Sequence, residues 1–476
     1  MRTLLLSSLS LSLILGAGCA SKKTSPSAKT VKSSSGGMMD WFRGSGFRVR
    51  PYRIVTLKNG MKVFFIQDDS LPRLSLQGLM KTGLRDEPTD LAGINSMTAA
   101  VLDQGTTKRD AMKLAGDFNA LGTEFAAGPG LDGTFLSASS LSTDADALLE
   151  LYAEVLMNPA FTQKEVDRTK SQTVAALRRK VDNPSGYATD LYELYLYGAH
   201  PYGRDTLGSL ATVNKIRRAD VIRHYLANYR PNNFTLAVVG RFDANFERKV
   251  AAVFEPWGGR EIKKQTADVP ANPEQLSLRF VSKKGLQQTQ LRLGRIGVTR
   301  DNPDYLALLV ASEAFGGGFS SRLMQKVRDD LGLTYSISSS VDARQAAGSF
   351  NISTFTRNEA VGKALDEILK LYKEFAANGI TEEELKSAKA QLIGQYPRGI
   401  ETADGTATGL VLLDFYGRPL SDLADFPKNV AKLSLKDVNA AISRHFTQGS
   451  LKVLVFGDEK AIGTQLKAMS PETIRL

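Results

Sequence analysis

The amino-acid sequence predicts an α+β fold that is written twice in one chain. Three observations lead to this prediction: β-rich runs divided by turn residues, long amphipathic helical patterns between them, and pairs of similar segments at a nearly constant separation. With 476 residues, the chain is long enough for two or more domains of ordinary size. We therefore expect two homologous halves, each a mainly antiparallel sheet flanked by helices.

The first eighteen residues are typical of a secretory signal. A single basic residue, Arg2, precedes an apolar run from Leu4 to Leu15, and small residues then lead to Cys19, the only cysteine. The apolar run is too short for a stable membrane span. Its end resembles a bacterial lipobox, although Gly16 stands where leucine is more usual. We expect residues 1–18 to be removed and Cys19 to be lipidated; the alternative is an ordinary signal peptide with an incidental cysteine.

Residues 19–51 predict a disordered, basic tether. Much of the net charge of +11 lies here, because positions 20 to 51 contain seven Lys and Arg residues and a single acidic residue, Asp40. The rest of the chain is close to balance, which argues against nucleic-acid binding. With Cys19 acylated, no thiol remains for a disulfide or a metal. Because Ser21 follows where inner-membrane lipoproteins carry aspartate, the resemblance favours the outer membrane, with the folded part facing the periplasm.

The folded part begins near residue 52 with two β-rich runs divided by Asn59-Gly60, a strong hairpin signal. Further along, similar helical and strand segments recur at a nearly constant offset, which predicts an internal repeat. Four pairs of matching positions carry this offset: Gly133 and Gly348, Thr162 and Thr381, Asp220 and Asp437, and Gly240 and Gly457. We expect an N-terminal domain over 52–265, a linker over 266–275 and a C-terminal domain over 276–476.

Several common catalytic signals are missing. The segment GPGLDG at 128–133 has dinucleotide-binding spacing, but Pro129 and the strand pattern after it favour a turn. Neither a phosphate loop nor G-x-S-x-G occurs. The three histidines, His200, His224 and His445, are far apart in the sequence and do not predict a metal site.

The segment GINSMTAAVLDQGT, residues 93–106, predicts a short helix. Ile94, Met97 and Val101 give it one apolar face. A second face carries only small residues without catalytic chemistry: Ser96, Ala99 and Ala100.

Three further segments accompany this helix and the duplication: GLRDEPTDLA before the helix, and DNPSGYATDLYELYLYGAHPYGRDTLGS and YRPNNFTLAVVG after it. With these features, the chain resembles the M16 or insulinase-type zinc peptidases. That family includes the mitochondrial processing peptidase and the cytochrome bc1 core proteins. The resemblance covers nearly all of residues 52–476 and implies two α/β-roll domains of the M16 type.

Active members of the family carry H-x-x-E-H on this helix, where two histidines bind zinc and the glutamate activates water. The resemblance puts Ser96 and Ala100 at the histidine positions, Ala99 at the glutamate and Ala176 near the third ligand. Neither H-x-x-E-H nor H-E-x-x-H occurs anywhere in the chain. The resemblance therefore implies a chain without zinc or another cofactor, with zinc only in a partner subunit.

In heterodimeric members of the family, a partner of the zinc subunit contributes an arginine and a tyrosine that hold substrate backbone near the scissile bond. EAFGGGFSSRLMQKVRDDLGLTYSISSS matches that segment, with Arg328 and Tyr335 at the pair and Gly316, Gly317 and Gly318 in the glycine-rich loop. A guanidinium and a strand phenol can hydrogen-bond peptide carbonyls and stabilise an oxyanion. Without the resemblance, the same residues fit a surface arginine, a half-buried tyrosine and a plain turn.

The resemblance implies a non-catalytic subunit of a heterodimeric M16 peptidase, lipid-anchored in the bacterial cell envelope. It would bind a peptide or unfolded-protein substrate together with a zinc-bearing M16 homologue. One alternative is a peptide-binding or scaffold lipoprotein without a protease partner. Another is an active metallopeptidase with ligands that the sequence does not reveal.

Overall fold

The computed structural model describes residues 49–263, 266–447 and 449–475. The described residues belong to one compact unit, Arg48–Leu476. The predicted signal, Cys19 and most of the predicted tether lie outside the described residues. Both predicted halves lie within this unit.

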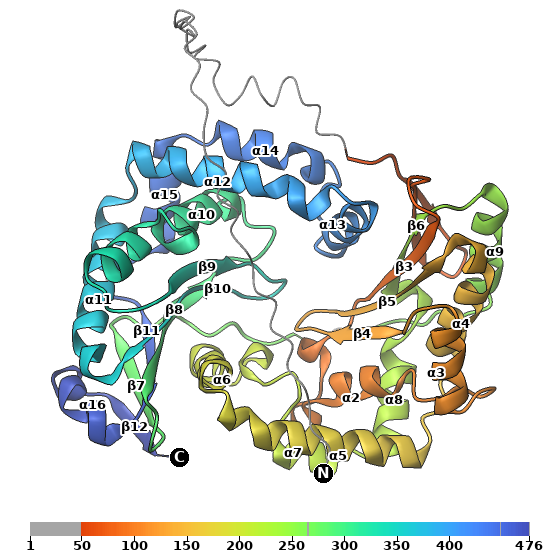
Figure 1. Ribbon diagram of the computed structural model, residues 1–476, viewed down its shortest axis with the longest axis horizontal. Coiled ribbons are helices and arrows are strands. Elements are labelled where there is room, and N and C mark those ends of the chain that lie inside the picture. The colour runs from red at the N-terminus through yellow and green to blue at the C-terminus, as the bar shows by residue number, and fades with distance from the viewer. Residues whose placement is uncertain (1–48, 264–265, 448, 476) are drawn as a thin grey trace, which may run out of the picture. The chain divides into compact units, whose positions relative to one another are not determined.

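Two six-stranded sheets form the framework of this unit (Figure 1). The first has the order β1-β2-β6-β3-β5-β4 and the second the order β12-β7-β11-β8-β10-β9. The first sheet contains β1 (Arg53–Thr56), β2 (Lys62–Gln67), β3 (Arg73–Met80), β4 (Ala126–Pro129), β5 (Thr134–Leu141) and β6 (Phe234–Gly240). The second contains β7 (Ser277–Ser282), β8 (Gln288–Gly297), β9 (Ile337–Asp342), β10 (Gly348–Arg357), β11 (Lys452–Gly457) and β12 (Glu472–Arg475).

Helices follow the strands in both halves. Those of the first half are α2 (Ile94–Val101), α3 (Ala111–Ala120), α4 (Ala145–Met157), α5 (Gln163–Arg179), α6 (Pro184–Tyr197), α7 (Leu210–Lys215), α8 (Arg218–Asn228) and α9 (Ala244–Phe254). Those of the second half are α10 (Tyr305–Ser312), α11 (Val361–Asn378), α12 (Glu382–Ile400), α13 (Ala403–Phe415), α14 (Asp422–Lys432), α15 (Leu435–His445) and α16 (Glu459–Leu466). In the described part of the chain, none of the helices combines the length and the apolar character that crossing a membrane requires.

The two sheets repeat one topology, which confirms the predicted α+β class and the internal repeat. Strands β2, β6, β3, β5 and β4 correspond in order to β7, β11, β8, β10 and β9. The first pair of each series is parallel, and the other pairs are antiparallel. Only the outermost strand differs, because β1 pairs antiparallel with β2 whereas β12 pairs parallel with β7. The predicted hairpin at Asn59-Gly60 is therefore confirmed, and Gly60 has the positive φ of 87° that its turn requires.

Each half gives one helix to the sheet of the other half. Helix α6 packs on β8 and β11 of the second sheet, whereas α13 packs on β2, β3 and β6 of the first. This second layer explains why β6 is buried along six of its seven residues, as expected for a strand covered on both faces. The two halves are therefore joined by packed helices as well as by the connecting segment between α9 and β7.

Polar contacts hold both exchanged helices in place. On β8, Arg292 donates from Nη2 to the carbonyl of Ser185 at 2.9 Å and from Nε to Oγ1 of Thr189 at 3.2 Å, both on α6. On α13, Asp414 forms ion pairs with Lys62 and, at 3.3 Å, with Lys81 of the first half. These contacts fix each helix in register on the sheet that it covers.

Candidate functional site

Helix α2 covers the segment where the resemblance places the zinc motif, and its amino terminus is capped by a buried carboxylate. Glu87 accepts hydrogen bonds from the backbone N–H of Gly93 at 2.8 Å and of Asn95 at 2.7 Å. Burial raises the pKa of Glu87 to about 8, against the lowering effect of these two donors. The start of α2 is thus fixed by a group that the sequence did not single out.

The four positions that the resemblance aligns with the zinc ligands and the general base carry none of the usual zinc-binding side chains. Ser96 is buried, and its hydroxyl donates to the carbonyl of Thr206 at 2.6 Å. Ala99 is buried, Ala100 is exposed, and Ala176 is half-buried on α5, which packs against α2. An alanine methyl has no lone pair to offer a metal ion. Across residues 49–263, 266–447 and 449–475, no three His, Cys, Asp or Glu side chains are grouped so that they could hold one.

The three histidines occupy separate places. Nδ1 of His200 accepts from the backbone N–H of Tyr202 at 3.1 Å, and Nε2 of His445 lies 2.8 Å from a carboxylate oxygen of Asp304. Nε2 of His224, on α8, lies 3.3 Å from Oδ1 of Asn95 on α2. Burial lowers the pKa of His224 to about 4, so it is neutral at physiological pH.

Arg328 and Tyr335, the pair that the resemblance implies, lie close together in the structure, and Phe319 lies beside them. The guanidinium carbon of Arg328 lies 5.5 Å from the ring centroid of Tyr335 and 5.5 Å from that of Phe319. Tyr335 is 78% exposed and Phe319 is 77% exposed. These three side chains form the aromatic–arginine cluster. Sequence reasoning missed Phe319, although an apolar residue directly after three glycines in a polar loop is a usable signal.

One detail of the prediction was wrong. Tyr335 does not lie on a strand but in a bend that ends before β9 begins at Ile337. Arg328 lies on a π-helical turn, Met324–Asp330, and a second such turn covers Glu313–Gly317. Single π-helical turns are often found at functional sites.

The polar atoms of the cluster are available to a ligand. The nearest acidic group to Arg328 is Oδ1 of Asp329, 3.8 Å from Nε. Within the described part of the chain, neither the guanidinium of Arg328 nor the hydroxyl of Tyr335 forms a hydrogen bond, so both can donate to an acceptor brought in from outside.

Close packing against backbone requires glycine at position 316, and positions 317 and 318 are crowded by flexible side chains. A Cβ at Gly316 would lie 2.6 Å from the backbone nitrogen of Ser339 on β9. A Cβ at Gly317 would lie 2.2 Å from a carboxylate oxygen of Glu313, and one at Gly318 would lie 2.4 Å from Nε2 of Gln391 on α12. The glycines therefore let the π-helical turn pack against β9 and α12, which places Phe319 at the surface.

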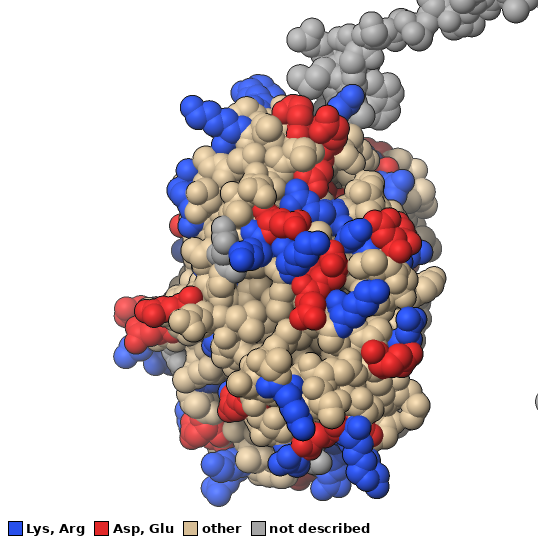
Figure 2. Space-filling view, turned by 90° about the vertical axis from the view of Figure 1, so that its left-hand side faces the viewer, with Lys and Arg blue, Asp and Glu red and all other residues tan. Residues whose placement is uncertain are grey.

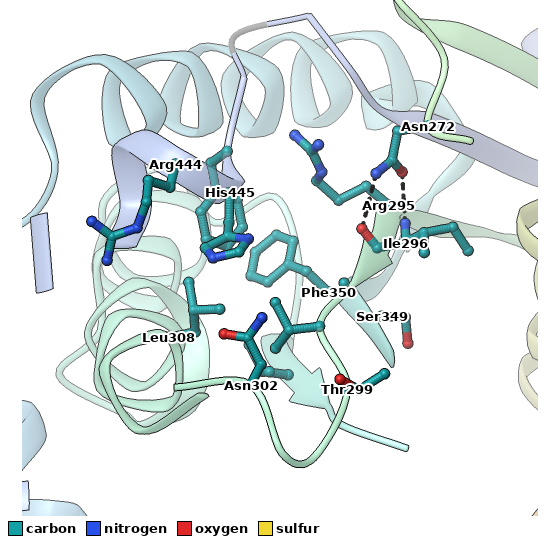
Figure 3. Close-up of a pocket in the computed structure, with 14 residues that line it drawn as sticks. Asn272, Arg295, Ile296, Thr299, Asn302, Leu308, Ser349, Phe350, Arg444 and His445 are labelled. Atoms are coloured by element: carbon teal, nitrogen blue, oxygen red, sulfur yellow. Dashed lines mark hydrogen bonds between the residues drawn. The ribbon is translucent and has the colours of Figure 1, made fainter. Parts of the chain in front are cut away.

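A cavity of about 380 Å³ lies away from this cluster, between β8, β10, α15 and the connecting segment (Figure 3). Its polar groups serve the fold. The side-chain amide of Asn272 accepts from the N–H of Ile296 at 2.7 Å and donates to its carbonyl at 3.0 Å. Arg444 and His445 both pair with Asp304. We assign this cavity no function.

The surface carries mixed charge. On the face shown in Figure 2, basic and acidic side chains lie among one another, and neither sign covers the face alone. Many of them are paired, as Arg322 is with Glu384 at 2.7 Å and Lys180 is with Asp190 at 2.8 Å. This agrees with the near balance of charge in the sequence beyond the basic N-terminal segment.

Two family models match adjacent parts of the chain. Residues 63–209 match the model described as insulinase, peptidase family M16. Residues 215–392 match the model described as the peptidase M16 inactive domain. The two matches together span most of the first half and the larger part of the second, up to the carboxyl-terminal part of α12.

Curated relatives cover most of the chain. It is 27% identical over 429 residues to a protein of Mycobacterium bovis named an uncharacterized zinc protease, covering 88% of this chain and 96% of the relative. It is 26% identical over 396 residues to a protein of the same description from Streptomyces coelicolor, covering 82% of this chain and 86% of the relative.

Solved structures share the fold. A peptidase M16 inactive domain from Pseudomonas fluorescens aligns with a TM-score of 0.79 and 28% identity, covering 86% of this chain and 98% of that one. A protease from Helicobacter pylori aligns with a TM-score of 0.76 and 21% identity, covering 86% and 100%, which supports the fold alone. The paired sheets, the segment of α2 and these matches agree, and the chain belongs to the M16 peptidase family.

Proposed function

We propose that this chain is a non-catalytic subunit of a heterodimeric M16 peptidase and contributes substrate binding to a zinc-bearing homologue in the bacterial cell envelope. The observation that carries the proposal is the aromatic–arginine cluster, whose exposed rings and unused donors suit a peptide ligand. The residues at Ser96, Ala99, Ala100 and Ala176 support the non-catalytic part, because they supply neither metal ligands nor a general base.

The chemistry of the cluster fits an extended peptide. Arg328 and Tyr335 can donate to peptide carbonyls, and a charged donor of this kind binds more strongly than a neutral one. Tyrosine and arginine are also enriched among the residues that dominate binding energy at protein interfaces. The cluster lies next to β9, the last strand in the order of its sheet, and an edge strand can pair with a peptide in extended conformation.

The hydrolytic step is assigned to the partner. Several relatives carry the name zinc protease, which supports a peptidase role for an assembly that includes a zinc-bearing homologue. In such an assembly, the partner's zinc would activate water, and the guanidinium and phenol of this chain would hold the substrate and steady the developing oxyanion. Lipidation at Cys19 would attach the assembly to the outer membrane, facing the periplasm.

The test combines the full-length chain with a homologue from the same genome that carries H-x-x-E-H. We expect Arg328→Ala or Tyr335→Phe to lower peptide turnover by about 100-fold, because each removes a positioned donor to the transition state. The yield of the complex on size-exclusion chromatography should not change. Arg223→Ala is the matched control, since its side chain is 71% exposed and pairs with Asp220 on α8.

The alternatives give different results. Complex formation with unchanged cleavage by both variants would remove the substrate-binding role and favour a scaffold lipoprotein. If the purified chain alone held one zinc per molecule and cleaved peptide in a chelator-sensitive way, it would be an active metallopeptidase with other ligands. A mutant that fails to assemble is replaced by Arg328→Lys, which keeps the charge but changes the donor geometry.

A further inference from the structure

A second cavity, of about 410 Å³, lies among helices α10, α12, α13 and α14. Helices α10, α12 and α14 contact one another, and α13 contacts α12 and α14. In Figure 1, α12 and α14 lie at the top, with α10 below α12 and α13 at their right-hand end. The walls are mainly apolar: Leu306, Ile400, Leu412, Leu413 and Leu423. On one side the rings of Tyr396 and Phe426 stack, with centroids 4.2 Å apart. Volume and lining are those of a pocket for a small organic molecule.

Arg300 is the unusual member of this lining. Its guanidinium carbon lies 4.4 Å from the ring centroid of Tyr305 and 5.8 Å from that of Tyr416, and it donates to the hydroxyl of Tyr305. The residue is half-buried. Within residues 49–263, 266–447 and 449–475, no Asp or Glu forms an ion pair with it. A permanent positive charge therefore faces an apolar, aromatic cavity, and within the described residues no carboxylate forms an ion pair with it.

The other arginine of the lining serves as an internal comparison. Arg418 forms an ion pair with Asp422, with Nη2 at 2.8 Å and Nε at 3.0 Å from the same carboxylate oxygen. Those two charges cancel, so the lining keeps one net positive charge, on Arg300. A half-buried cation without an acidic partner binds an added anion more favourably than a paired one does, because no existing ion pair must be broken.

We propose that this cavity binds a small organic monocarboxylate with an apolar body, such as a medium-chain fatty acid or an aromatic acid. The carboxylate pairs with the guanidinium of Arg300, and the apolar body packs among the leucine side chains and the stacked rings of Tyr396 and Phe426. A free peptide carboxyl terminus with an apolar last residue offers the same chemistry. The site is independent of the zinc-motif positions and of the aromatic–arginine cluster.

The first test needs no mutation. The full-length chain is titrated by calorimetry with octanoate, with 3-phenylpropionate and with octan-1-ol. We expect saturable binding of at least one carboxylate, and binding of octan-1-ol weaker by about 10-fold or more, because the alcohol lacks the charge that Arg300 binds. N-acetyl-Ala-Ala-Phe, as the acid and as the amide, separates a peptide source of the carboxylate from a free acid.

Variants assign the effect to the residue. Arg300→Gln should weaken carboxylate binding by about 10-fold or more and leave octan-1-ol unchanged. The control is the double variant Arg418→Gln/Asp422→Asn, which removes both members of the ion pair and should change carboxylate binding by about 2-fold or less. Leu412→Trp should block all ligands by filling the cavity. The proposal is overturned if no carboxylate saturates in the millimolar range, if octan-1-ol binds as well as octanoate, or if Arg300→Gln and the double variant behave alike. The comparison of acid with alcohol decides the matter even if Arg300→Gln does not fold.

Discussion

Asn95 connects three buried polar groups at the start of α2. Its backbone N–H donates to Glu87, its side-chain amide donates to Oγ1 of Thr134 at 3.0 Å, and its side-chain oxygen lies 3.3 Å from Nε2 of His224. Buried polar groups of this kind fix a local structure only when all partners are present. The start of α2, the helix that the resemblance aligns with the zinc motif, is therefore fixed by a hydrogen-bond network.

This network predicts a pH dependence of stability. Because burial lowers the pKa of His224 to about 4 from an ordinary value of 6.5, the unfolded chain takes up its proton first as the pH falls. The stability that depends on neutral His224 is fully present above pH 6.5 and is lost as the pH falls towards 4. Between pH 7 and pH 5 the loss is on the order of 2 kcal/mol. We expect His224→Gln to remove this part of the pH dependence in urea unfolding.

Glu87 changes the stability of the fold with pH in the opposite direction, so its effect must be measured apart from that of His224. Since its folded pKa is raised to about 8, its contribution is fully present below pH 4.5 and is lost as the pH rises towards 8. The comparison is therefore made between the wild type and His224→Gln at each pH, so that the change at Glu87 cancels. A difference in unfolding free energy that stays constant from pH 7 to pH 5 would contradict the prediction.

At the site, the resemblance singled out Arg328 and Tyr335 as a pair but did not predict the backbone conformation that carries them. Arg328 and Tyr335 are seven positions apart, so a short connection was bound to keep them near each other. The position of Tyr335 before the strand and the partnership of Phe319 depend on two π-helical turns, which have no reliable sequence pattern. Asn95 and His224 are distant in sequence, and only the packing of α2 on α8 brings them together.

Among the helices and strands, α6 is the one whose position is most clearly explained by specific contacts, those of Arg292 on the second sheet. Arg292 is buried under it and donates to four backbone or side-chain acceptors besides Thr189: the carbonyls of Leu291, Thr354 and Ser185 and the hydroxyl of Ser185. Burial lowers the pKa of Arg292 to about 10, which still leaves it charged at neutral pH. One cation thus satisfies acceptors on both β10 and α6.

Loss of this arginine should release α6. We expect Arg292→Met to destabilise the fold by about 2–4 kcal/mol, because it leaves buried acceptors unpaired. Hydrogen exchange over Pro184–Tyr197 should rise more than exchange in the first sheet. The control is Arg357→Met, whose side chain is 58% exposed on the same sheet and which should cost about 0.5 kcal/mol or less. Equal effects of the two substitutions would show that Arg292 does not anchor the helix.

The sequence predicted strands and helix starts well, because local signals determine them. Asn59-Gly60 forms its hairpin, and the helices that follow Thr162 and Thr381 both begin with that threonine as the cap. The exchange of α6 and α13 was not predicted. An amphipathic helix can cover either of two similar sheets, and nothing in its own sequence pattern distinguishes them.

For the whole molecule, the predicted anchor at Cys19 is the feature to test in cells. The apolar run that ends at this residue predicts processing and acylation, and both lie outside the described residues. We expect the chain to fractionate with membranes and to incorporate a labelled fatty acid, and Cys19→Ala to abolish both. A Ser21→Ala chain, which keeps the cysteine, serves as the control. Membrane association and labelling that survive in Cys19→Ala would show that the signal is of the ordinary kind.

The duplication could be predicted from the sequence because matching positions keep a nearly constant offset, as Gly240 and Gly457 do at the ends of β6 and β11. Its structural form was not, since the repeat could equally have produced two separate domains. The halves instead share one compact unit, because each sheet is covered by a helix from the other half.

That exchange has an evolutionary consequence. Helices α6 and α13 follow the equivalent helices α5 and α12, so α6 and α13 are themselves equivalent. Each half therefore covers the sheet of the other half with the same element. Such reciprocity is the signature of a two-fold symmetric dimer in which identical short chains swap one segment. Fusion of the gene with its own copy would preserve every swapped contact while freeing the two copies to diverge. A swapped dimer of identical chains of half this length would show the same two sheets and the same two covering helices.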